Sequence, residues 1–148
     1  MAVPFSHWID VRDKPGFLHR LMVELAGDAR MSLEGDLSEC HLHDEHILSR
    51  EEVGVLRRNT SSPRLDFVIL KLEPDTVSLL YKQIVAAGVT EAIIHVQIER
   101  NGSLQLGAYD NFHRDCVVTG PEVSPDILAN MKASGVVRSF DSAPGGGA

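Results

Sequence analysis

The chain lacks the features that mark exported or membrane-spanning proteins. Its 148 residues include only two cysteines, Cys40 and Cys116, so a disulfide framework is not indicated. No apolar run approaches 18 residues, and a transmembrane helix is therefore not expected. The first residues also lack the charged and then apolar order of a signal peptide. We expect a cytoplasmic protein in a reducing compartment, with no membrane partner.

A surplus of basic residues is also missing. The sequence has 14 Lys and Arg against 21 Asp and Glu, a formal net charge of −7. Nucleic acid is therefore not expected as a partner, because phosphate binding needs clustered Lys and Arg. Between residues 34 and 52, seven acids accompany one base. Such a surface accelerates association with a basic protein, although acids that serve only solubility are the alternative.

No motif of a known enzyme class occurs in the sequence. There is no Walker loop, no Gly-x-Gly-x-x-Gly after a strand, no His-Glu-x-x-His and no Gly-x-Ser-x-Gly. We therefore assign no catalytic residue and expect no cofactor.

The composition itself is that of one globular domain. The hydrophobic fraction is 43% and the charged fraction 24%, both ordinary for a soluble protein of this size. We expect a single domain over residues 1–141, followed by a flexible Gly-rich tail over residues 142–148.

Three helices have recognisable ends. The first is expected between Asp13 and Gly27, the second over residues 74–87, and the third between Ser124 and Gly135. The signals are capping Asp and Ser side chains, a proline in the first turn, and a glycine after the last turn.

The expected strands alternate with these helices. Residues 29–37 alternate between apolar and polar side chains, which is typical of a half-buried strand, and residues 65–72 are almost wholly apolar. The other expected strands are residues 92–99, 103–110, 117–118 and 136–140. Together these elements predict an α+β domain with three helices and a mixed, mainly antiparallel sheet of about five to six strands.

The hairpin around the Asn-Gly pair allows a register prediction. A two-residue loop at 101–102 would place Ile98 opposite Gln105. A three-residue loop that also includes Arg100 places Ile98 opposite Leu104 instead. Because the buried face sets the register, we predict the three-residue loop, with its glycine left-handed in a G1 bulge.

The least regular stretch, residues 38–64, carries most of the acidic run and could contain a short helix at 51–58. It also holds Cys40, His43 and His46, whose side chains are zinc ligands. Their spacing is not a common structural-zinc pattern, so a partly solvated polar loop is the favoured alternative.

The hairpin exit, residues 109–116, is the second cluster of reactive side chains. Cys116 could act as a nucleophile with His113 or His95, but a tight turn with some binding role is the favoured interpretation. For His95 itself, we expect a buried, hydrogen-bonded side chain in preference to a metal ligand or a general base. Glu34 and Asp36 share one strand face, where they are either paired carboxylates or part of a solvated surface.

Residues 93–117, IIHVQIERNGSLQLGAYDNFHRDCV, precede a Pro-capped helix and the segment GVVRSF. This order resembles the C-terminal part of small bacterial proteins of the immunity-protein type, which are encoded beside polymorphic toxins. The resemblance covers about the last third of the chain. It implies a stoichiometric inhibitor of a secreted toxin, without catalysis of its own.

We therefore predict a non-catalytic protein-binding domain, in which the acidic segment or the hairpin exit contacts a partner such as a basic toxin domain. The alternative is a small metal-binding or Cys/His-dependent enzyme that uses Cys40, His43 and His46, or His113 and Cys116. The predicted binding residues are Glu34, Asp36, Asp44, Glu45, Glu51, Glu52, Tyr109, Asp110, Asn111, His113 and Arg114.

Overall fold

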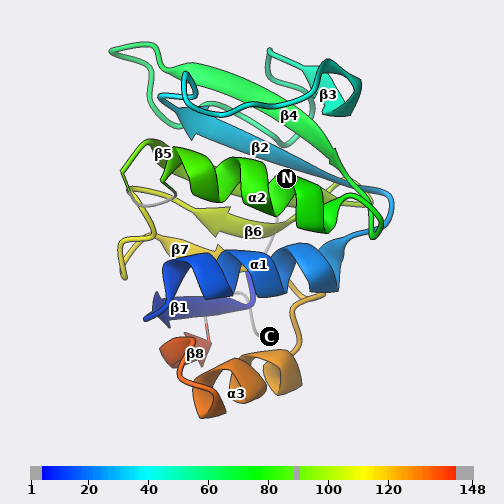
Figure 1. The fold of residues 1–148 in the computed structure, drawn as a ribbon. Coiled ribbons are helices and arrows are strands. Elements are labelled where there is room, and N and C mark those ends of the chain that lie inside the picture. Colours follow the sequence, from blue (N-terminus) through cyan, green and yellow to red (C-terminus); the bar gives the residue numbers. More distant parts are fainter. Residues whose placement is uncertain (1–4, 89–90, 143–148) are drawn as a thin grey trace.

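One antiparallel sheet of eight strands organises the protein (Figure 1). A computed structural model describes residues 5–88 and 91–142. The strand order is β3-β4-β2-β5-β6-β7-β1-β8, and every pairing in it is antiparallel. The strands are β1 (His7–Val11), β2 (Ala29–Gly35), β3 (Ile47–Ser49), β4 (Asp66–Leu72), β5 (Ile93–Arg100), β6 (Ser103–Ala108), β7 (Val117–Thr119) and β8 (Val137–Ser142).

The three predicted helices are α1 (Lys14–Leu25), α2 (Val77–Ala87) and α3 (Pro125–Ala133). A short 3-10 turn, η1 (Asp44–His46), lies between β2 and β3. Figure 1 shows α1 and α2 lying across the same face of the sheet, with α3 beside β8. The predicted caps are confirmed: Asp13 accepts a hydrogen bond from the backbone of Gly16 at 3.0 Å, and Ser124 accepts one from Ile127 at 3.3 Å. No helix within the described residues is long and apolar enough to cross a membrane.

The predicted number of strands was wrong, and so was the expectation that the mainly antiparallel sheet is mixed. The sheet has eight strands because β1 and β3 were not expected, and no parallel pair occurs between its named strands. Both missed strands are short and carry polar residues, so their extended conformation depends on pairing with neighbours. β1 pairs with β7 and β8, and the edge strand β3 pairs with β4. The short helix considered at residues 51–58 is absent; an isolated bridge between Val53 and Leu56 occurs there. Of the expected tail, Ser142 ends β8 and the rest lies outside the described residues.

The hairpin register was also predicted incorrectly. Arg100 pairs with Ser103, so the loop has two residues, both left-handed with φ of +55° and +80°, as in a type I′ turn. A bulge one pair further on places Ile98 opposite Leu106 and leaves Gln105 as the extra residue. The bulge thus places apolar residues of the two strands on the same sheet face, which the longer loop was expected to do. Of the predicted turn geometry, only the left-handed glycine is confirmed.

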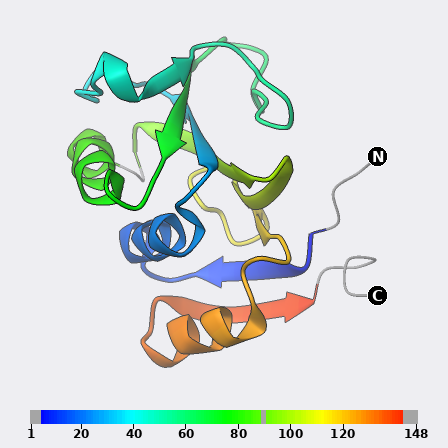
Figure 2. The same ribbon diagram turned by 90° about the vertical axis from the view of Figure 1, so that its right-hand side faces the viewer.

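Two hydrophobic cores lie on the two faces of the sheet. The larger one is formed with the helices, by residues such as Phe17, Met31 and Ile98. The smaller one contains Leu56, Phe67 and Ile69. Residues 50–65, here called the strap, supply Leu56 to this second core from the side away from α1 and α2 (Figure 2). The strap therefore covers the β4 end of the sheet's second face.

Candidate functional site

The sheet face opposite α1 and α2, here called the open face, carries the polar residues of β2 and β5. The register pairs Glu34 with His95 and Ser32 with Gln97. All four side chains are buried although they are polar or ionisable. Buried polar groups are costly unless they are hydrogen-bonded, so their partners indicate what this face does.

Glu34 fastens the strap to the sheet. Its side chain is 1% exposed, and its two carboxylate oxygens accept the backbone N–H groups of Asn59 at 2.6 Å and Thr60 at 3.2 Å. Charge-assisted bonds of this kind are stronger than neutral ones. The structure therefore places Glu34, one of the predicted binding residues, inside the protein, where the strap occupies its carboxylate.

His95 joins the strap to the hairpin exit. Its Nδ1 accepts the backbone N–H of Asp110 at 3.2 Å, and its Nε2 lies 2.8 Å from the Thr60 hydroxyl. A neutral ring that accepts at Nδ1 carries its proton on Nε2 and donates to Thr60. Burial lowers the pKa of His95, while the negative charges of Glu34 and Asp110 oppose this shift. The ring is thus a neutral, hydrogen-bonded structural group, as the sequence suggested.

Gln97 extends the same network toward the centre of the sheet. Its oxygen accepts from the Ser32 hydroxyl and from the backbone of Arg57, both at 3.0 Å, and its nitrogen donates to the Tyr109 hydroxyl at 3.0 Å. Burial raises the pKa of Tyr109, which keeps the phenol neutral. This network connects the strap with the hairpin exit and is here called the latch. Its side chains are those of Ser32, Glu34, His95, Gln97 and Tyr109, and each has a hydrogen-bond partner within the protein.

Backbone strain shapes the hairpin exit. Asp110, Asn111 and Phe112 are consecutive left-handed residues, with φ of +50°, +57° and +61°. This conformation costs roughly 1–2 kcal/mol for an ordinary L-residue and less for Asp or Asn. The buried Phe112 ring packs edge-on against Phe17, with centroids 6.3 Å apart, so core packing offsets the strain. The turn leaves the following residues, including Arg114, exposed.

A groove of about 400 Å³ lies beside this exit, at the β1 and β8 end of the sheet, and its size is in the range of ligand pockets. It is lined by Trp8, Ile9 and Asp10 of β1, Ser139 and Asp141 of β8, and Arg114 and Asp115 of the loop. The register pairs Trp8 with Asp141 and Asp10 with Ser139. Residues more than a hundred positions apart thus form one lining.

The groove combines an aromatic ring with a negative charge. Trp8, the only tryptophan of the chain, is 39% exposed. Three aspartates and one arginine line the groove, and Asp10 also accepts a bond from Arg138 at 3.3 Å. An indole face beside carboxylates can hold a cationic group through cation–π and ionic contacts.

The acidic segment is exposed but partly neutralised in space. Asp44, Glu45, Glu51 and Glu52 are all on the surface. Glu51 forms an ion pair with Arg64 at 3.3 Å, and Glu52 accepts the backbone N–H of Arg58 at 3.0 Å. Asp36 accepts bonds from the hydroxyl and backbone of Ser38, which lower its pKa. Arginines of the strap therefore offset part of the negative charge of the acidic segment.

The predicted hairpin-exit residues separate into two groups. Tyr109, Asp110 and Asn111 make internal contacts, the last through its backbone N–H to the carbonyl of Ile94 at 2.9 Å. His113 and Arg114 are exposed. Of the five, only Arg114 lines the groove.

Cys116 does not form a pair with a histidine side chain among the described residues. Its sulfur lies 3.6 Å from a carboxylate oxygen of Asp110, and burial together with that carboxylate raises the pKa of the thiol. A raised pKa disfavours the thiolate that a nucleophile requires. The contacts therefore do not supply the base that the Cys-His alternative needs.

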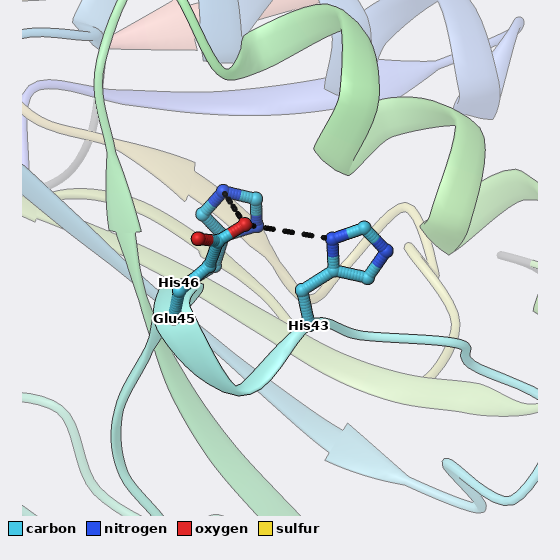
Figure 3. A group of neighbouring side chains, drawn as sticks. All are labelled: His43, Glu45 and His46. Carbon is cyan, nitrogen blue, oxygen red and sulfur yellow. Dashed lines mark ion pairs between the residues drawn. The ribbon is translucent and has the colours of Figure 1, made fainter.

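The predicted metal ligands are only partly brought together. His43 and His46 lie close to each other, but their third neighbour is Glu45 (Figure 3). Cys40 is absent from that group and packs against the hydrophobic core, where burial raises the pKa of its thiol. Of the three predicted ligands, the structure brings His43 and His46 together and leaves Cys40 outside the group.

Sequence reasoning named only Arg114 among the seven lining residues of the groove and missed the other six: Trp8, Ile9, Asp10, Asp115, Ser139 and Asp141. The alternation in His-Trp-Ile-Asp-Val could have placed Trp8 and Asp10 on one strand face, with Ile9 and Val11 on the other. No local signal connects that segment with residues 139–141, because a strand pairing sets their proximity.

Comparison with known proteins gives no relative from which a role could be transferred: no family model, no curated protein and no solved structure matches the chain.

Proposed function

We propose that this chain is a non-catalytic protein-binding domain that receives a Lys or Arg side chain of a basic partner in the groove beside the hairpin exit. The observation that carries the proposal is the exposed Trp8 among Asp10, Asp115 and Asp141. A surface aromatic residue in a concave site is a frequent anchor of protein interfaces.

The charge of the protein favours the same class of partner. The net charge of −7 attracts a basic protein at long range and raises the association rate. A stoichiometric inhibitor of a basic toxin domain is the specific form of this function, supported by the resemblance of the C-terminal third to immunity proteins. The acidic segment would then serve mainly in electrostatic attraction.

Trp8 provides a direct test, because as the sole tryptophan it reports on the groove through its fluorescence. The probe is a synthetic peptide that alternates Lys and Gly, titrated into the full chain at low ionic strength. We expect a saturable change in emission whose midpoint rises with added salt, because exposed charge contacts are screened. A peptide of equal length that alternates Glu and Gly should give no change.

Charge reversal distinguishes the groove from the rest of the surface. The double variant Asp115→Lys with Asp141→Lys should weaken the peptide affinity by about tenfold or more, which corresponds to roughly 1.4 kcal/mol. The control, Glu51→Lys with Glu52→Lys, changes the net charge equally on the acidic segment and should retain more of the affinity. Circular dichroism verifies that both variants are folded. No saturable response in the unaltered protein, or a larger loss in the control, would contradict the groove assignment.

A further inference from the structure

A single turn before the edge strand β3 brings three metal-ligating side chains together. His43, Glu45 and His46 each offer one ligand atom, and these atoms all lie within 4.8 Å of one another. The turn is closed by a backbone hydrogen bond from His46 to the carbonyl of His43 at 3.0 Å. In Figure 3, dashed lines mark the ion pairs of the Glu45 carboxylate with both imidazole rings.

The donor separations are close to those of a metal centre. Glu45 Oε1 lies 3.7 Å from His43 Nδ1 and 3.9 Å from His46 Nε2. Metal–ligand bonds of 2.0–2.1 Å in a tetrahedral arrangement place donors about 3.3 Å apart. The two separations that include Glu45 would therefore shorten by about half an ångström. The separation of the two histidine nitrogens, which is at most 4.8 Å, would shorten by up to about 1.5 Å through side-chain rotations on an exposed turn.

The burial of the three groups suits an anchored but accessible site. The His46 side chain is 14% exposed, whereas those of His43 and Glu45 are 54% and 74% exposed. The two imidazole rings are stacked, with centroids 5.7 Å apart and planes 11° apart. His46 is thus a largely buried ligand, and the exposed side chains of His43 and Glu45 can close on an ion that arrives from solvent.

The donor set selects the class of ion. Two imidazoles and one carboxylate suit zinc and neighbouring divalent transition metals. Calcium and magnesium take oxygen ligands almost exclusively. Three protein ligands leave at least one coordination position for water or a partner's side chain.

We propose that His43, Glu45 and His46 bind one divalent transition-metal ion, with zinc as the best fit, at the turn that leads into β3. The site is separate from the groove beside the hairpin exit, so it stands independently of the proposed protein-binding function. A bound ion would order the turn and, because it binds the folded chain, would stabilise the protein.

The test is a calorimetric titration of zinc chloride into untagged full-length protein that has been freed of metal by a chelator and dialysed. We expect one zinc per chain and a rise in melting temperature at saturation. Each of the variants His43→Ala and His46→Ala should lower the zinc affinity by more than about tenfold, since even the loss of an outer-shell partner costs 10- to 100-fold. The matched control is His41→Ala, an exposed histidine outside the group, which should bind zinc like the parent.

A second measurement identifies the ligands. With cobalt as the probe, the visible absorption of the bound ion should lack a thiolate-to-cobalt charge-transfer band, and Cys40→Ser should bind zinc as tightly as the parent. Absence of stoichiometric zinc binding, undiminished affinity in both His43→Ala and His46→Ala, or a loss of binding in Cys40→Ser would each overturn the assignment.

Discussion

At the scale of single residues, burial separates acidic side chains that the sequence presents alike. Glu34 is enclosed and holds two backbone N–H groups of the strap, whereas Glu39 is exposed on the next loop. Loss of a buried charged acceptor leaves its donors without partners. The stability of the strap therefore depends on one carboxylate.

Replacement of that carboxylate gives a first stability prediction. Glu34→Ala should lower the free energy of unfolding by about 2–4 kcal/mol, since it removes two charge-assisted bonds and leaves a gap under the strap. Glu39→Ala should change it by less than about 0.5 kcal/mol. Urea denaturation measures both values. Trypsin should also cleave the Glu34 variant faster within the strap, and equal cleavage of the two variants would show that Glu34 does not hold this segment.

At the scale of elements, the hairpin between β5 and β6 shows how two irregularities cooperate. The two-residue turn starts the pairing, and the bulge at Gln105 then changes the alternation, so that Leu106 faces the large core while Leu104 packs against the small one. The Gln105 side chain is buried and accepts the backbone N–H of Glu122 at 2.9 Å. Both faces of the hairpin are thereby used for packing.

The turn glycine allows the backbone contribution to be measured alone. Gly102 has φ of +80°, and a Cβ built there meets no atom within 4 Å. Gly102→Ala should therefore destabilise the protein by about 1 kcal/mol through conformation and not through a clash. Gly102→Asn should lose less, because Asn tolerates the left-handed region. Thermal unfolding of both variants tests this order, and equal stability of the two would argue against a type I′ turn.

At the scale of the whole molecule, the two faces of the sheet have different roles. One face carries the main core under α1 and α2, while the open face carries the strap, the polar latch and the groove in succession across the strands. The latch includes the neutral His95. The stability of the molecule is therefore coupled to pH.

The sign of that coupling follows from the lowered pKa of His95. Between its folded pKa and its unfolded value near 6.5, the unfolded chain binds the additional proton, so the free energy of unfolding rises with pH in this interval. The contribution of His95 is complete above about pH 6.5 and declines as the pH falls below it. Denaturant unfolding at pH 7.5 and at pH 5.5 should show this decline.

A variant isolates the histidine in that experiment. His95→Gln keeps an acceptor for Asp110 and a donor for Thr60 but removes the titrating ring, so its stability should fall less between the two pH values than that of the parent. The other six histidines are common to both chains and cancel in the difference. An identical pH dependence in both proteins would mean that His95 does not contribute to it.

Local rules allowed much of the fold to be predicted. The caps at Asp13 and Ser124 and the alternation in β2 each depend on neighbours a few residues away. The same is true of the left-handed turn glycine. These features follow from backbone sterics and short-range hydrogen bonding, so the sequence by itself determined three helices, the main strands and the α+β class.

Tertiary structure alone decided the features that depend on distant partners. The short strands β1 and β3 are held by their pairing with neighbouring strands. The bulge at Gln105 lets Leu106 pack in the large core and Leu104 against the small one. Glu34 is enclosed only because the strap covers it. Trp8 and Asp141 line one groove only because β1 pairs with β8, which brings the beginning of the chain to its end. Such contacts form when the entropy cost of closing long loops is repaid by burial, a balance that no local stretch of sequence contains.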